Sequence, residues 1–122
     1  MAWQFDGNRP IYAQLVEHIQ YDIVSGVYPP GEKLPTVREL ATLAGVNPNT
    51  MQKALAELET DGLIFTQRTA GRFVTQDVEA IRQARERLSQ SILQSFLQSM
   101  GHLGCTPQQS LEILTKYVEG SN

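Results

Sequence analysis

The sequence has 122 residues and a mass of 13.6 kDa, which fits one small domain or one module with a short appendage. Hydrophobic residues make up 41% and charged residues 19%, a balance that allows a packed core and argues against disorder. The net charge is −3, which argues against a generally basic surface for nucleic acid or membrane but not against a local basic patch.

Further classes are excluded by cysteine usage and hydropathy. Cys105 is the only cysteine, which excludes a disulfide framework and a Cys₂His₂ or Cys₄ zinc site. No run of 18 apolar residues and no signal-peptide pattern is present, so we expect a cytoplasmic protein without a membrane partner. Phosphate-binding glycine loops, catalytic triads and metal-ligand clusters are also missing from the sequence, which predicts no catalytic residues, no metal and no cofactor.

The first predicted helix begins after Pro10 and ends near Gly26, because glycine favours the position just past a helix. We place the polar Gln14 off its buried face and expect His18 to be solvated. The predicted buried stripe repeats every four residues and consists of Ile11, Leu15, Ile19 and Ile23.

Two short helices follow, each with a recognisable start. The second begins at Thr36, where Glu39 completes a capping box, and ends at Gly45. The third begins at Asn47-Pro48, with asparagine as the N-cap and proline in the first helical position. Its predicted buried stripe is Met51, Leu55 and Leu58.

The rest of the chain predicts a hairpin and two more helices. Residues 63–67 and 72–75 read as strands joined by a loop at 68–71. A long helix is predicted over about 77–103, and a last helix begins at Thr106-Pro107. The predicted fold is therefore mainly α with a small β-hairpin: a winged helix-turn-helix domain over 9–76 and a two-helix dimerisation region over 77–122.

The charge map of the second and third helices and the hairpin favours a nucleic-acid surface. Residues 40–56 contain one base, Lys53, and no acid, while residues 62–76 contain Arg68 and Arg72 and no acid. Phosphates repel acids, so an acid-free half of the third helix suits docking in the major groove of DNA. A helical wheel turns Asn49 and Lys53 away from the core, with Thr50 and Gln52 on the flanks.

Segments 10–15 (PIYAQL), 26–41 (GVYPPGEKLPTVRELA), 46–54 (VNPNTMQKA) and 58–64 (LETDGLI) resemble the N-terminal domain of GntR-family bacterial transcription regulators. The resemblance covers about 9–75. It implies that Arg38 contacts a phosphate or base, that the third helix enters the major groove, and that the wing tip enters the minor groove. The short helical tail resembles the YtrA-like branch, whose small members dimerise through such tails and often lie beside transporter genes.

Ten positions are the candidate DNA-binding residues: Arg38, Asn47, Asn49, Thr50, Gln52, Lys53, Arg68, Thr69, Gly71 and Arg72. The sequence departs from the family pattern at Pro48 and Gln52, where members often carry arginine. The wing also departs from the common Gly-Lys-Gly-Thr. Arg72 either replaces the charge of the missing lysine or lies on the other face of the hairpin.

The long helix of the tail carries more apolar residues than one companion helix can cover, which favours dimerisation. The predicted dimer interface is Leu88, Ile92, Leu93, Phe96, Leu97, Met100, Leu111 and Leu114. Alternatively, the winged domain of the same chain covers part of this surface.

The sequence thus predicts a dimeric, sequence-specific, DNA-binding transcription regulator, a repressor acting on a pseudo-palindromic operator, with a transporter operon as one candidate target. Its partners would be double-stranded operator DNA and a second copy of the chain. Any small-molecule effector is unidentified, and it would bind the dimer interface or the junction near Gln76. One alternative is a winged-helix protein-interaction module without DNA binding. Another is a fragment of an enzyme fusion, although the tail ending at Asn122 is expected to be complete.

Overall fold

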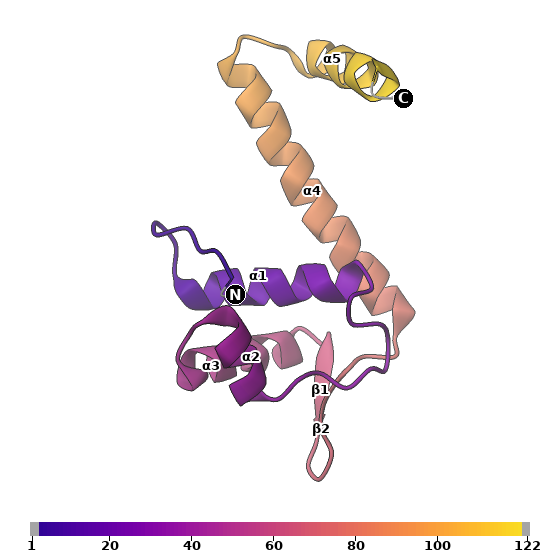
Figure 1. Cartoon of the computed structure of the whole chain (residues 1–122). Coiled ribbons are helices and arrows are strands. Elements are labelled where there is room, and N and C mark those ends of the chain that lie inside the picture. Colours follow the sequence, from indigo (N-terminus) through magenta and orange to yellow (C-terminus); the bar gives the residue numbers. More distant parts are fainter. Residues whose placement is uncertain (1–2, 121–122) are drawn as a thin grey trace. The chain divides into compact units, whose positions relative to one another are not determined.

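The computed structural model describes residues 3–120 and is 63% helical, which confirms the mainly α fold class with a winged helix-turn-helix (Figure 1). The predicted elements are all present, with boundaries within one or two residues of those expected. In chain order they are α1 (Ile11–Val24), α2 (Val37–Ala44), α3 (Pro48–Thr60), β1 (Ile64–Gln67), β2 (Gly71–Val74), α4 (Val78–His102) and α5 (Pro107–Gly120).

The chain forms two compact units, one ending at Arg85 and the other starting at Glu86. This division falls inside α4, whereas the sequence suggested a boundary between residues 76 and 77. Ile81 and Ala84 are only 4% and 2% exposed and belong to the core of the first unit. The Arg85 guanidinium also donates to the carbonyl oxygen of Val24 at the end of α1, over 3.1 and 3.2 Å. The first turns of α4 are therefore part of the winged unit.

The core of the first unit lies between α1, α3 and the buried face of the hairpin. Leu15 and Ile19 of α1 are fully buried, as predicted. The predicted stripe of α3 is also fully buried, and Ile64 and Val74 close the core from the two strands. Since α3 is packed on both α1 and the hairpin, its outward face has a defined direction.

Two residues of α1, Ile11 and Gln14, differ in burial from what the sequence predicted. Ile11 is 41% exposed, while Gln14, placed off the buried face, is only 9% exposed. The Gln14 amide accepts from the N–H of Asp6 and donates to the Asp6 carbonyl, both over 2.7 Å. Phe5 of the same segment is partly buried and packs against the hydrophobic core. Gln14 is therefore buried by a segment that folds back onto α1, and its polar atoms are satisfied by that backbone.

His18 was expected to be solvated, and its side chain is 39% exposed, but it also has a stacking partner. Its ring stacks on Trp3, with ring centroids 3.6 Å apart and an interplanar angle of 3°. Its Nε2 lies 3.5 Å from Oδ2 of Asp22. Burial raises the pKa of Asp22, an effect that His18 opposes. The stack holds the N-terminal segment against α1.

The turn between α2 and α3 is built as the sequence predicted. Thr36 and Glu39 form the reciprocal capping box, with bonds of 2.8 and 3.1 Å. Gly45 has a φ of +74°, the left-handed conformation that glycine adopts without strain. The Asn47 side chain accepts from the N–H of Asn49 over 2.7 Å and caps α3. These local bonds set where α3 begins relative to α2.

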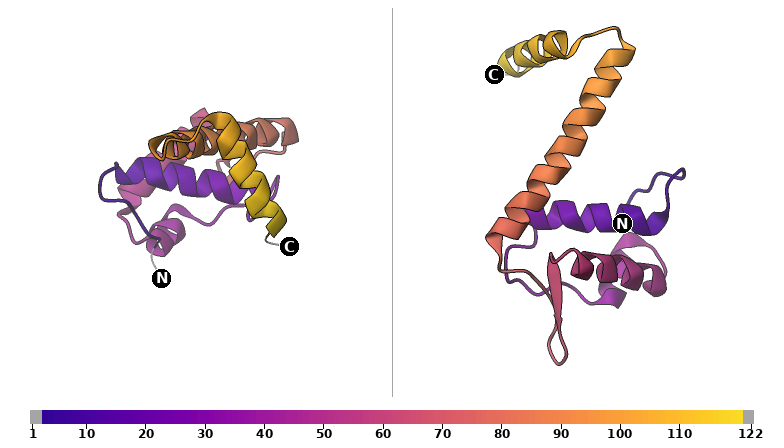
Figure 2. Two further views of the ribbon diagram at one scale, coloured as in Figure 1. Left: turned by 90° about the horizontal axis from the view of Figure 1, so that it is seen from above. Right: turned by 180° about the vertical axis from the view of Figure 1, so that it is seen from behind.

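The hairpin is a two-stranded antiparallel sheet with Ile64 opposite Val74 and Gln67 opposite Gly71. The segment before α2 supports its outer edge, because Leu34 N–H donates to Arg72 O over 2.8 Å and Val74 N–H donates to Glu32 O over 2.9 Å. Figure 1 and the right view of Figure 2 show the hairpin loop extending beyond α2 and α3.

The second unit contains most of α4 and all of α5. The α5 helix begins with a second capping box, formed by Thr106 and Gln109 with bonds of 2.9 and 3.1 Å. Large apolar side chains of this unit are exposed, among them Ile92, Leu93, Leu97, Leu111 and Leu114. Within residues 3–120, no helix combines the length and the apolar character needed to cross a bilayer.

Candidate nucleic-acid interface

The outward face of α3 carries polar side chains at the predicted positions. Asn49, Gln52 and Lys53 are exposed and Thr50 is half-buried. Met51 and Leu55 of the same helix are fully buried and face the core. The polar side chains therefore point to the opposite side of α3, toward solvent. The N-terminal half of α3 therefore presents amides, a hydroxyl and an ammonium group to solvent.

Lys53 has a partner that sequence reasoning did not assign. Its Nζ lies over the ring of Tyr12 in α1, 4.0 Å from the ring centroid, within the range of a cation–π interaction. Tyr12 lies near the start of α1 and is half-buried. The contact ties the end of the Lys53 side chain to α1 while the residue stays exposed.

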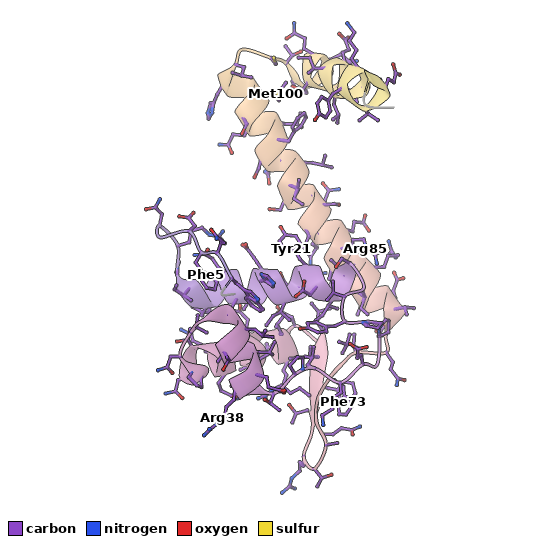
Figure 3. All side chains as sticks on the ribbon, viewed as in Figure 1. Phe5, Tyr21, Arg38, Phe73, Arg85 and Met100 are labelled. Atoms are coloured by element: carbon purple, nitrogen blue, oxygen red, sulfur yellow. The ribbon has the colours of Figure 1, made fainter. Side chains whose placement is uncertain are left out.

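Arg38 stands on the exposed side of α2. Figure 3 shows its side chain extending away from the helix. One hollow that it lines includes Gly45 and Pro48 of the turn into α3, and another includes Lys33 and Gly71 beside the hairpin. Arg38 therefore borders both the turn into α3 and the segment beside the wing.

The acid next to Arg38 is engaged locally. Hydrogen bonds from the backbone and side chain of Thr36 lower the pKa of the Glu39 carboxyl. Glu39 stays ionised as part of the cap, and the Thr36 N–H donates to its Oε1 over 2.8 Å.

The wing tip exposes Arg68 and Thr69 in the loop between the strands. Gly71 has a φ of +111°, and a Cβ built on it would lie 3.1 Å from Cε of Lys33. A residue with a Cβ would be strained at this φ and would also crowd the Lys33 side chain, so both observations favour glycine at position 71. Gly71 is thus needed to shape the wing, whether or not it touches a ligand.

Arg72 is directed toward α3 and not toward the loop tip. Its Nε donates to Oε1 of Glu59 over 3.2 Å, and the two side chains are 20% and 34% exposed. Glu59 lies in the last turn of α3. Spacing could not reveal the pair, because the two residues are brought together by the packing of the hairpin on α3.

Metal ligands do not gather in the described part of the chain: residues 3–120 contain no group of three or more His, Cys, Asp or Glu side chains placed to hold an ion. The candidate residues thus form a polar and cationic surface over α2, α3 and the wing. Such a surface is suited to contacting phosphates and base edges.

Residues 11–74, more than half of the chain, match the family model described as bacterial regulatory proteins, gntR family. The chain belongs to the GntR family of bacterial regulatory proteins. The resemblance drawn from the sequence motifs is thereby confirmed.

Sequence similarity to known regulators extends beyond the winged domain into the C-terminal helices. The chain is 37% identical over 117 residues to the HTH-type transcriptional regulator YhcF of Bacillus subtilis, covering 96% of this chain and 97% of that protein. It is 37% identical over 92 residues to the HTH-type transcriptional repressor YtrA of the same organism, covering 70% of this chain and 71% of YtrA.

Solved structures agree with this assignment. A GntR-family transcriptional regulator from Listeria monocytogenes superimposes with a TM-score of 0.84 and 39% identity, covering 92% of this chain and 98% of that one. The DNA-binding domain of AraR in complex with operator ORX1 has a TM-score of 0.56 and 35% identity, covering 59% of this chain and 93% of that one. This GntR protein is a transcription regulator with a DNA-binding winged helix-turn-helix, and its relatives are regulators, not enzymes.

Proposed function

We propose that the protein is a homodimeric repressor that binds a pseudo-palindromic operator, with α3 in the major groove and the wing at the minor groove. The observation that carries the proposal is the exposed, acid-free surface of α3 between Asn49 and Lys53, flanked by the exposed Arg38 and Arg68. A major groove about 12 Å wide admits one helix, and neighbouring cations can then bind the phosphates on either side.

The exposed side chains have distinct proposed roles. Arg38, Lys53 and Arg68 bind phosphates, while Asn49, Thr50 and Gln52 approach base edges. Asn47 and Thr69 lie at the two margins of this surface. Because the side-chain oxygen of Asn47 already accepts from Asn49 N–H, its amide nitrogen is the group left to donate to DNA.

The proposed dimer is supported by the apolar surface of the second unit. Leu93 and Leu97 of α4 are 49% and 40% exposed, and Leu111 of α5 is 54% exposed. Burying a leucine fully is worth roughly 1.5–3 kcal/mol, so a second copy covering this surface would gain several such contributions. Twofold symmetry of the dimer would match twofold symmetry of the operator.

Repression and the target are inferred from the relatives. YtrA is named a transcriptional repressor, and the YtrA-like resemblance favours a transporter operon as the target. A repressor whose operator overlaps the promoter blocks polymerase by occupying the DNA and needs no contact with polymerase. The described residues, a DNA-binding unit and two C-terminal helices, are sufficient for that mode of repression.

The direct test is fluorescence anisotropy with two duplexes, the upstream region of the protein's own gene and a scrambled sequence of the same composition. We expect binding that prefers the upstream region and weakens steeply as salt rises. Selection from a randomised duplex pool should return a sequence with two related half-sites. Absence of any sequence preference at micromolar protein would contradict the proposal and favour the protein-interaction alternative.

Arg38→Ala is expected to weaken binding to the upstream and scrambled duplexes by the same factor, because a phosphate contact carries no sequence information. The plot of log affinity against log salt should become shallower by about 0.9. Arg82→Ala, which removes a cation paired with Glu79, serves as the control. It should change neither the affinity for the duplexes nor the salt slope. A loss of discrimination at one base pair would instead show that Arg38 reads a base.

Tyr12→Leu is expected to weaken DNA binding by about two- to fivefold, because Lys53 loses the ring that holds its ammonium group near the surface of α3. Tyr12→Phe keeps the ring and should bind like the wild type. Anisotropy titrations at one salt concentration measure both variants. Equal affinities for the leucine and phenylalanine variants would show that the ring contact does not prepare Lys53 for DNA.

A further inference from the structure

The wing and the recognition helix are joined by one carboxylate. Oε1 of Glu59, in the last turn of α3, accepts from Nε of Arg72 on β2 over 3.2 Å and also accepts from the hydroxyl of Thr66 on β1. Thr66 and Arg72 stand directly opposite each other in the hairpin. A single side chain of α3 is thus bonded to both strands of the wing at the same level.

The position of this contact follows from the alternation of the strands. Ile64 and Val74 form the pair at the open end of the hairpin, two residues farther from the loop than Thr66 and Arg72. Both point into the core and are 2% and 0% exposed. Side chains two residues apart share a face of a strand, so Thr66 and Arg72 continue that face beyond the core. They meet α3 where its buried stripe ends at Leu58. The polar contact extends the packing of hairpin on helix toward the wing tip.

The contact changes the role of Arg72. Its guanidinium is paired with a carboxylate and is only 20% exposed, so its charge is largely compensated within the protein and is less available to a phosphate. Arg68 at the loop tip, in contrast, is exposed. Arg68 is then the cation that the hairpin loop offers to the minor groove, and the angle of the hairpin on α3 decides where Arg68 lies.

We infer that Glu59 is a positioning residue for DNA recognition: through Thr66 and Arg72 it holds the wing at a defined angle to α3. The inference rests on the proposed sequence-specific DNA binding, and it reassigns Arg72 from phosphate contact to support of the wing. Although an acid near DNA opposes binding electrostatically, Glu59 improves operator selectivity because it orders the wing before DNA arrives.

The test compares Glu59→Gln with Glu57→Gln in the full chain. Glu57 is an exposed acid on the same helix, so its variant removes the same charge without touching the wing. If Glu59 only repelled phosphates, both variants would bind every duplex more tightly. We expect Glu57→Gln to do so slightly, and Glu59→Gln to lose about fivefold in the ratio of selected-operator to scrambled-duplex affinity. Equal behaviour of the two variants would overturn the inference.

A charge-reversed double variant, Glu59→Arg with Arg72→Glu, tests whether restoring the ion pair also restores operator selectivity. It restores an ion pair in the opposite sense, and we expect it to recover most of the selectivity that either single change loses. If Arg72 bound a phosphate, the double variant would keep the acid that Arg72→Glu places at that phosphate, and it would recover none of the affinity or selectivity that Arg72→Glu loses. That result would return Arg72 to the DNA-contacting set and overturn the inference.

Hydrogen exchange of the free protein separates this inference from the proposed function. Amides of β1 and β2 should exchange faster in Glu59→Gln, remain unchanged in Glu57→Gln, and recover in the double variant. Unchanged exchange in Glu59→Gln would overturn the positioning role whatever the DNA result. If wild type discriminates no duplex although exchange responds as expected, the proposed function fails, and the role of Glu59 in recognition fails with it.

Discussion

Replacing both Leu93 and Leu97 with aspartate is expected to make the protein monomeric and to weaken operator binding by roughly a hundredfold or more. The two leucines are 49% and 40% exposed in the second unit, on the surface proposed to meet a second copy. A carboxylate buried there without a partner would oppose association strongly. Since each monomer would then reach one half-site alone, the gain from simultaneous binding would be lost. Sedimentation equilibrium should return a mass near 13.6 kDa.

The matched control places the same two charges on the opposite side of the helix. At about 100° per residue, Ser91 and Ser95 lie across from the leucines, and both are exposed. Ser91→Asp with Ser95→Asp should remain dimeric and bind the operator like the wild type. A leucine double variant that still sediments as a dimer would show that the interface lies elsewhere. A monomeric wild type would refute the dimer itself.

Leu55→Ala is expected to lower the free energy of unfolding by about 3 kcal/mol, within the range measured for buried leucines in other proteins. Leu55 is fully buried in α3, where the helix packs on the core of the winged unit. Truncation leaves a cavity and removes a contact that orients α3, so operator affinity should fall with stability. Urea unfolding followed by circular dichroism measures the change, at one fixed protein concentration because dimerisation would contribute to stability.

Leu43→Ala is the control for this change, since Leu43 is the same residue type on α2 but is 47% exposed. It should cost less than about 1 kcal/mol, because little apolar area returns to water. If the two alanine variants lost equal stability, Leu55 would not belong to the rigid core that directs α3. The position of the outward residues would then need another explanation.

Elements whose signals are local could be predicted from the sequence. The capping box of Thr36 and Glu39, the left-handed Gly45 and the cap at Asn47 each depend on residues within a few positions. Their free energies are decided by the nearby backbone, which the order of residues specifies directly. The direction of the α3 face was equally accessible, because the helical period places Met51 and Leu55 on one side.

The partners of the candidate site residues depended on packing between distant segments. Arg72 meets Glu59 and Lys53 meets Tyr12, pairs whose members belong to different elements and share no local signal. The burial of Gln14 required the N-terminal segment to fold back and offer the backbone of Asp6. The two side-chain pairs involve small free energies at partly exposed sites, and the Gln14 bonds depend on a distant segment of backbone. All of these contacts follow from how the elements pack, so residue spacing could not predict them. Local backbone preferences and hydrophobic periodicity specified the elements and their buried faces, whereas the packed structure chose which polar side chains are engaged within the protein and which remain exposed for DNA.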